Sequence, residues 1–348
     1  MSSATDRQQI SELAAALRDL KLLGEQQKYV ASPLSGGVSC DVFLFEIEER
    51  EPVVVKRALA SLRVQADWRA PVERAETEVE WLALARKLDP RIAPPVIARD
   101  PRRHLFVMPY LPKEVFPVWK HELAAGQIDL GFAEHVGLWL ARLHNATAGV
   151  DEISERFSNM AQFRALRLEP YLTCAAEKNP EVSARLQSLI DGIARSRIAL
   201  MQGDVSPKNL LHGPETPVFL DAETACYGDP AFDLAFCLNH LLLKSVWHPE
   251  HTDAYGRAFA ALKNGYCSVI SWEPPDSLER RAASIVAGLL LARVDGKSPV
   301  EYITRTDEKD FVRRQARRYL QECPGTLGAV ATDWTAAIKA YFASSGSR

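Results

Sequence analysis

The hydrophobic pattern of this chain changes about one third of the way along it. In the first part, apolar residues form short β-branched or aromatic runs at 42–47 and 53–56, separated by a charged turn at 48–51. Such runs predict antiparallel strands. From residue 132 onward, apolar positions recur at helical spacing. We therefore expect a β-rich lobe over residues 1–110, followed by a mostly helical lobe over 111–348.

Two helices and two further strands complete the predicted first lobe. Leu13, Leu17 and Leu20 mark an amphipathic helix within 11–23, and a second helix over 71–88 begins at a proline. The further strands are expected at 95–98 and 104–108, before a Pro-Tyr-Leu-Pro linker. In the second lobe, periodicity predicts helices at 137–144, 182–193, 231–243, 252–266, 278–293, 307–323 and 329–342.

Composition narrows the class of protein. Of 348 residues, 47% are apolar and 25% charged, which excludes general disorder. The net charge of −3 gives no electrostatic drive toward nucleic acid. The six cysteines lack C-x-x-C spacing, and neither a secretory signal nor an apolar run of membrane-spanning length is apparent. We expect a cytoplasmic protein with no membrane or nucleic-acid partner; its oligomeric state is not readable.

The most informative stretch runs Q-G-D-V-S-P-K-N from Gln202 to Asn209, and D-A-E follows from Asp221. Asp204, Asn209 and Asp221 stand among apolar runs at 198–201, 210–211 and 218–220. Phosphoryl transfer needs one carboxylate at the acceptor hydroxyl, and an amide and a second carboxylate to hold Mg²⁺. The spacing favours this chemistry over three unrelated turn or cap residues, which Asp and Asn also supply.

These motifs resemble those of the aminoglycoside phosphotransferase and choline kinase superfamily, whose loop is H-G-D-x-x-x-x-N followed by I-D-F/W-E. The likeness continues through G-D-P-A-F-D-L-A from Gly228 to Ala235 and covers roughly residues 35–235. The resemblance implies an α+β, bilobal, protein-kinase-like fold, with a small antiparallel-sheet N-lobe that binds nucleotide and a large helical C-lobe for catalysis and acceptor binding. It also implies a small-molecule kinase that uses ATP (GTP is not excluded) and Mg²⁺.

The resemblance assigns roles in the second lobe. Asp204 would position and deprotonate the acceptor hydroxyl. Asn209 and Asp221 would ligate Mg²⁺, with Glu223 near a second metal or the acceptor. Asp233 would brace the catalytic loop from the following helix.

In the first lobe, the turn at 34–39 is similar to the family's phosphate-covering turn, with Ser35, Gly36, Gly37 and Ser39 as candidate contacts. Lys56 ends a strand, as a phosphate-binding lysine does. It needs a carboxylate from the next helix; Glu78 is our choice, while Glu76 and Glu80 remain alternatives. Met108, Tyr110 and Leu111 form the expected hinge that would bind the nucleotide base.

Gln202 departs from the family's usual histidine, which braces the loop. Glutamine can still donate and accept hydrogen bonds, so we expect activity to survive. The departure also motivates an alternative, a nucleotide-binding pseudokinase or regulatory module without efficient transfer. A protein kinase ranks lower, because G-D-P follows Asp221 too soon for an activation segment.

Two other motifs are set aside. Gly296-Lys297-Ser298 lacks the earlier glycine and strand of a Walker A motif, and predicts a helix end or a substrate-side loop. His248 and His251 flank a proline with no third ligand nearby, which argues against zinc. Aminoglycosides, choline-like alcohols, amino-alcohols, methylthioribose and other sugars all remain possible acceptors, and residues 251–322 should decide among them.

Overall fold

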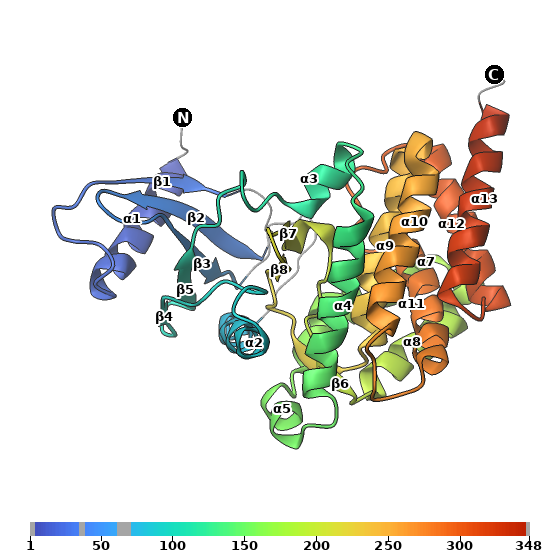
Figure 1. Ribbon diagram of the computed structural model, residues 1–348, viewed down its shortest axis with the longest axis horizontal. Coiled ribbons are helices and arrows are strands. Elements are labelled where there is room, and N and C mark those ends of the chain that lie inside the picture. The colour runs from blue at the N-terminus through green and yellow to red at the C-terminus, as the bar shows by residue number, and fades with distance from the viewer. Residues whose placement is uncertain (1–3, 35–38, 61–70, 346–348) are drawn as a thin grey trace. The chain divides into compact units, whose positions relative to one another are not determined.

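The computed structural model describes residues 4–34, 39–60 and 71–345. Contacts divide the chain into two units, Met1–Phe116 and Pro117–Arg348. The division falls six residues beyond the break expected after residue 110. Figure 1 colours the first unit from blue to teal and the second from green to red.

The first unit is built on a five-stranded sheet with the order β1-β2-β3-β5-β4. Each neighbouring pair is antiparallel. The strands are β1 (Tyr29–Pro33), β2 (Cys40–Ile47), β3 (Val53–Ala58), β4 (Ala98–Asp100) and β5 (Leu105–Pro109). The fourth strand begins at Ala98, where the sequence predicted residues 95–98, and the prolines at 94 and 95 precede it. Proline cannot donate to a strand ladder, so pairing starts after them.

Alternation along the strands gives the sheet two distinct faces. Phe43, Phe45 and Val55 pack on one face against Leu13 and Leu17 of α1 (Ala4–Asp19). The opposite face meets α2 (Arg74–Leu88), whose Ala75 packs beside Cys40 and Ala58. Lys56 shares the α2 face with Ala58, because the two are two residues apart on β3.

The second unit is mostly helical, as the periodicity predicted. Its α-helices are α3 (Trp119–Ala124), α4 (Leu130–Thr147), α5 (Asp151–Arg156), α6 (Met160–Phe163), α7 (Cys174–Lys178), α8 (Ser183–Arg195), α9 (Ala231–Trp247), α10 (Thr252–Cys267), α11 (Pro275–Asp295), α12 (Thr306–Glu322) and α13 (Leu327–Ser345). A π-helix, η1, spans Arg164–Thr173, and short 3₁₀ turns occur at η2 (Pro180–Val182), η3 (Pro207–Asn209) and η4 (Pro249–His251).

Helix α9 forms the centre of this unit, since every residue from Ala231 to Val246 is buried. Helices α4 and α10 pack together through two glycines. A Cβ at Gly137 would lie 2.0 Å from the Leu262 carbonyl oxygen, and one at Gly265 would lie 2.1 Å from that of Glu134. In the described part of the chain, no helix is both long enough and apolar enough to cross a bilayer.

Two small antiparallel sheets carry the segment around Asp204. Strand β6 (Ala199–Met201) pairs with β9 (Cys226–Gly228), and β7 (Leu210–His212) pairs with β8 (Pro217–Phe219). Three of these strands coincide with the apolar runs noted in the sequence, whereas β9 was not predicted. The loop from Gln202 to Ser206 therefore connects β6 to η3, which leads directly into β7.

Candidate active site

The loop that carries Asp204 turns sharply at Gly203. This glycine has a φ of +83°, and a Cβ there would lie 2.6 Å from the Thr224 side-chain oxygen and 2.7 Å from the Thr224 carbonyl oxygen. Only glycine fits both the left-handed conformation and the close approach. The turn directs the chain from β6 into the segment that bears Asp204, whose side chain is only 5% exposed.

Asp233, from the first turn of α9, holds this loop through hydrogen bonds to its backbone. Its Oδ2 accepts a hydrogen bond from the Gln202 N–H at 2.6 Å, and its Oδ1 accepts one from the Gly203 N–H at 2.9 Å. His144 Nε2 lies 3.3 Å from Oδ2, and its Nδ1 lies 2.7 Å from the Tyr266 hydroxyl. Carboxylate bonds to successive backbone N–H groups fix the loop to the central helix.

Gln202, where the resembling family has histidine, makes three side-chain hydrogen bonds. Its Oε1 accepts from the Asp204 N–H at 2.6 Å. Its Nε2 donates to the carbonyl oxygens of Leu220 (2.7 Å) and Asp221 (3.1 Å). A neutral imidazole offers one donor and one acceptor, so this amide makes one more bond than histidine could. It ties the Asp204 loop directly to the segment that carries Asp221.

Asn209 connects the same two segments on the other side of the loop. Its Nδ2 donates to the Asp204 carbonyl oxygen at 3.0 Å, and its own carbonyl oxygen accepts from the Leu220 N–H at 2.9 Å. Asp221 has a φ of +62°, an uncommon conformation for a residue other than glycine. Such backbone conformations persist where the surroundings impose them, and they concentrate at functional sites.

Two cations contact Asp204 that the sequence analysis did not single out. Arg167 Nη2 lies 2.9 Å from Asp204 Oδ2, and Arg167 Nε donates to the Gly203 carbonyl oxygen at 2.8 Å. Lys208 Nζ lies 3.3 Å from Asp204 Oδ2 and 4.0 Å from Asp221 Oδ2. The Lys208 side chain is 43% exposed, whereas that of Arg167 is 7% exposed. One ammonium group thus joins the two predicted functional carboxylates.

Burial lowers the pKa of Arg167, but the carboxylate of Asp204, with further contributions from Glu223 and Asp221, raises it above the ordinary value. For Lys208, desolvation likewise lowers the pKa, and Asp204 and Asp221 raise it overall. Both cations therefore stay charged in the presence of these carboxylates. Glu223 is buried, with 4% exposure, and lies within electrostatic range of Arg167.

The donors suit a magnesium ion that also binds nucleotide phosphates. Within residues 4–34, 39–60 and 71–345, no group of three His, Cys, Asp or Glu side chains could hold a metal alone. Mg²⁺ usually takes one or two protein carboxylates and completes its shell with phosphates and water. Asp221 and the amide oxygen of Asn209 fit that pattern, because Nδ2 of Asn209 is the atom used toward Asp204.

In the first unit, Lys56 is paired with Glu78. Its Nζ lies 2.8 Å from one carboxylate oxygen and 2.7 Å from the other, and the two side chains are 7% and 3% exposed. Glu76 instead pairs with Arg99 at 2.8 Å. Of the three carboxylates left open by periodicity, Glu78 therefore has an observed contact with the lysine.

The phosphate-covering turn lies partly outside the described residues, because Ser35, Gly36 and Gly37 fall there. Ser39 is described and is 7% exposed. Its carbonyl oxygen accepts from the buried Arg74 of α2, which also donates to the Leu59 carbonyl oxygen. Arg74 thereby fixes the chain that follows the turn to the end of β3.

The hinge candidates lie at the end of β5. Met108 pairs with Val54 in the sheet, and the Tyr110 N–H donates to the Pro52 carbonyl oxygen at 3.0 Å. That donor is engaged within the sheet. A nucleotide base would therefore have to use other backbone groups of Met108, Tyr110 or Leu111, all of which are partly exposed.

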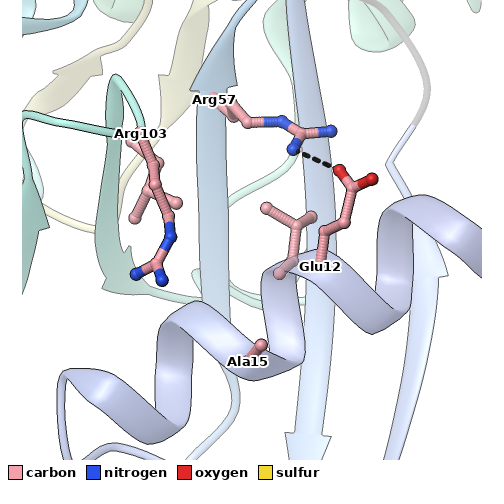
Figure 2. A pocket seen from close by; sticks show the side chains of 6 residues that line it. Glu12, Ala15, Arg57 and Arg103 are labelled. Atoms are coloured by element: carbon pink, nitrogen blue, oxygen red, sulfur yellow. Dashed lines mark hydrogen bonds and ion pairs between the residues drawn. The ribbon is translucent and has the colours of Figure 1, made fainter.

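A separate hollow in the first unit is lined by Glu12, Leu13, Ala15, Arg57, Arg103 and Leu105. Figure 2 shows the guanidinium of Arg57 directed at Glu12, at 2.9 Å. Arg57 also pairs with Asp41, and Arg103 pairs with Asp19 and Asp100. Because Arg57 and Lys56 are consecutive on β3, the hollow lies on the sheet face opposite the Lys56–Glu78 pair.

The Gly296 motif ends a helix. The Gly296 N–H donates to the Ala292 carbonyl oxygen in the last turn of α11. Lys297 donates its N–H to the Pro170 carbonyl oxygen at 2.7 Å, so the segment binds η1 through its backbone.

The chain belongs to the phosphotransferase enzyme family, whose model matches residues 30–275. It is 24% identical over 229 residues to methylthioribose kinase 1 of Oryza sativa subsp. japonica, covering 58% of this chain and 53% of that protein. The chain thus spans about half the length of this relative. The family resemblance inferred from the loop motifs is confirmed.

Solved structures share the fold at low identity. A choline/ethanolamine kinase family protein from Mesorhizobium loti aligns with a TM-score of 0.52 and 14% identity, covering 94% of this chain and 98% of that one. An amicoumacin kinase in complex with AMP-PNP, Ca²⁺ and Ami aligns with a TM-score of 0.54 and 15% identity, covering 90% and 94%. The predicted protein-kinase-like fold class, with an antiparallel-sheet part and a helical part, is confirmed.

Proposed function

We propose that this chain transfers the γ-phosphoryl group of ATP to a hydroxyl of a small molecule. The observation that carries the proposal is the position of Lys208, whose ammonium group contacts both Asp204 and Asp221. A carboxylate for the acceptor and a carboxylate for the metal are thus held on either side of one positive charge. That arrangement suits phosphoryl transfer, because catalysis rests on positioning and charge neutralisation.

Each residue has a defined part in the proposed reaction. Asp204 accepts a hydrogen bond from the acceptor hydroxyl, aligns its oxygen and receives its proton as the new P–O bond forms and the bond from the γ-phosphorus to the β–γ bridging oxygen breaks, which releases ADP. Lys208 neutralises charge on the phosphoryl group in transit. Arg167 fixes the orientation of the Asp204 carboxylate. Lys56, oriented by Glu78, would bind the α- and β-phosphates.

Asn209 and Asp221 would hold Mg²⁺, which neutralises the nucleotide phosphates when bound. Glu223 is the further candidate for a second metal or for the acceptor. In the first unit, Ser35, Gly36, Gly37 and Ser39 would cover the phosphates, and backbone groups of Met108, Tyr110 and Leu111 would bind the base. The amicoumacin kinase complex with AMP-PNP and Ca²⁺ supports a nucleotide and a divalent ion as ligands of this fold.

The test measures consumption of ATP and of GTP, with and without Mg²⁺, against a panel of aminoglycosides, choline and sugars. We expect Asp204→Asn to abolish transfer while nucleotide binding persists, and Asp221→Asn to weaken the Mg²⁺ dependence of binding. Asp253→Asn is the matched control, since this acid is 61% exposed and pairs only with Lys339 among the described contacts.

Wild-type transfer rates in Asp204→Asn would overturn the assignment of the acceptor carboxylate. Nucleotide binding without metal dependence, and without transfer to any acceptor, would instead favour a pseudokinase or regulatory module.

A further inference from the structure

A buried lysine in the second unit has no role in the phosphoryl chemistry described above. Lys244, near the end of α9, is 1% exposed. Its Nζ has no hydrogen-bond partner among the described residues. A buried ammonium group without hydrogen bonds is costly, so its retention needs an explanation.

Two aromatic rings border this ammonium group. Nζ lies 5.1 Å from the Trp247 ring centre and 4.7 Å from that of Tyr302. The two rings are stacked with their centres 4.9 Å apart. The Tyr302 hydroxyl is also buried and lacks a hydrogen-bond partner in the described part of the chain. The Lys244 ammonium group and the Tyr302 hydroxyl are thus two buried polar groups, both at this ring pair, to which the described residues supply no hydrogen bond.

The surrounding charges are predominantly positive. Lys120 of α3 forms an ion pair with Glu301, and among the residues that the structure describes Glu301 is the one carboxylate that acts on Lys244. Arg293 of α11 contributes a further cation nearby, as it acts together with Lys244 and Lys120 on His240. Burial, followed by Lys120, lowers the pKa of Lys244 to about 8. Burial and the same cations keep His240 neutral by lowering its pKa well below the usual value.

A chain of contacts links Arg293, one of the cations near Lys244, to Asp204. Arg167, which binds Asp204, lies over the Tyr171 ring at 5.8 Å. The Tyr171 hydroxyl lies 3.2 Å from Nη1 of Arg293. Along α9, Lys244 lies eleven positions after Asp233, which holds the catalytic loop, a rise of roughly 16 Å. A lysine side chain and a small metabolite together can span that separation.

We propose that the acceptor carries an anionic group, a carboxylate or a phosphate, which binds the Lys244 ammonium group and the Tyr302 hydroxyl. The inference rests on the proposed function, because it assigns one end of the acceptor of that reaction. It disfavours choline-like acceptors. Aromatic rings can bind a quaternary ammonium group, but here the protein's own Lys244 already occupies the rings, and like charges would repel.

The first test compares matched alcohols in the full-length protein with a non-hydrolysable ATP analogue and Mg²⁺. Ribose, ribonate and ribose 5-phosphate form the set, and choline is the cationic comparison. We expect an anionic member of the set to bind at least tenfold more tightly than ribose, and choline to bind no better than ribose. Comparison of the carboxylate compound with the phosphate ester shows which of the two anions the site prefers.

The second test uses variants. Lys244→Met keeps the length and apolar contacts of the side chain, and should weaken anion binding roughly 10- to 100-fold, the usual effect of losing a charged hydrogen-bond partner. Binding of the neutral parent should change little. Lys339→Met is the control, because that lysine is 56% exposed on α13. Equal preference for the anion in wild type and Lys244→Met would overturn the proposal.

A third test needs no variant. Above pH 8 Lys244 becomes largely neutral, and a bound anion would raise its pKa again, so binding at pH 8.5 should take up a proton. Calorimetry in buffers of different ionisation enthalpy measures that uptake. The groups facing Lys244 are Lys120, Glu301, Arg293, His240 and Tyr302. Burial lowers the pKa of His240 well below its usual value and raises the pKa of the Tyr302 hydroxyl, so neither of these two groups accounts for proton uptake near pH 8.5. Anion binding without proton uptake at this pH would contradict the proposal.

The outcomes separate this inference from the proposed function. Transfer to neutral or cationic alcohols only would refute the anion site and leave the kinase assignment intact. Anion binding that depends on Lys244, but without transfer from ATP or GTP to any acceptor, would support the site and refute the kinase assignment.

Discussion

Arg167 and Asp204 form a buried ion pair in which Nη2 of the arginine lies 2.9 Å from Oδ2 of the aspartate. The arginine comes from a π-helix, η1, and the aspartate from the loop after β6. Single π-helical segments inside helical regions often occur at functional sites. The wider turn of η1, which includes Pro170, carries Arg167 to the Gly203–Asp204 segment.

Replacing Arg167 should impair the orientation of the Asp204 carboxylate. For Arg167→Met we expect kcat to fall roughly 10- to 100-fold, as a charge-assisted hydrogen bond is lost. Urea unfolding should show a loss of about 3 kcal/mol or more, because Asp204 loses a buried partner. Arg167→Lys should lose less of both. The exposed Arg197→Met serves as control, and equal behaviour of the two methionine variants would refute the positioning role.

Gln202 should tolerate histidine better than leucine. Gln202→Leu removes three hydrogen bonds and leaves buried backbone groups unsatisfied, at about 1–3 kcal/mol for each such group. Gln202→His retains one donor and one acceptor. We expect kcat and the free energy of unfolding to rank wild type first, then histidine, then leucine. A leucine variant as active and stable as wild type would show that this brace is unnecessary.

The Lys56–Glu78 pair should contribute far more than its neighbour on the same helix. Glu78→Ala leaves Lys56 buried without its observed carboxylate partner, with an expected cost of about 3–5 kcal/mol and a higher KM for ATP. Glu76→Ala breaks an ion pair with Arg99 whose side chains are 32% and 52% exposed. Its expected cost is about 0–1 kcal/mol. Denaturant titration and steady-state kinetics of both variants provide the comparison.

Gly203 and Gly149 make a matched pair for testing the loop. Both have positive φ, +83° and +69°, but only Gly203 is crowded, by Thr224, whereas nothing lies within 4 Å of a Cβ at Gly149. Gly149→Ala should cost about 1–2 kcal/mol from backbone strain alone. Gly203→Ala should cost more and also reduce kcat, because the Asp204 loop must move. Similar thermal shifts for the two variants would contradict this view of the turn.

Periodicity was sufficient to predict the long helices. Helices α8 to α13 begin and end within a few residues of the ranges expected from apolar spacing. Short elements were harder to predict from the sequence. Strand β9 has three residues, so pairing with β6 defines it more than its composition does. The π-helix contains Pro170, which interrupts the helical pattern that a sequence reader would follow.

For the candidate site, local spacing singled out Asp204, Asn209 and Asp221, because all three lie within one short stretch of the sequence. Arg167 was missed because its contact with Asp204 spans 37 positions and no local motif marks it. Lys208 lies within the quoted motif, but a charged loop residue next to a proline is ordinarily solvated. The choice of Glu78 over Glu76 depended on which helix face meets β3, and periodicity had left that open.

Helix α9 bears Asp233 at its first turn and Lys244 near its last, and both are held within one buried rod. Under the two proposals above, catalysis and acceptor recognition would lie at opposite ends of this one helix. Substitutions at Lys244 and its aromatic neighbours would then change which metabolite is accepted, while the hydrogen bonds from Asp233 to the Asp204 loop stay in place.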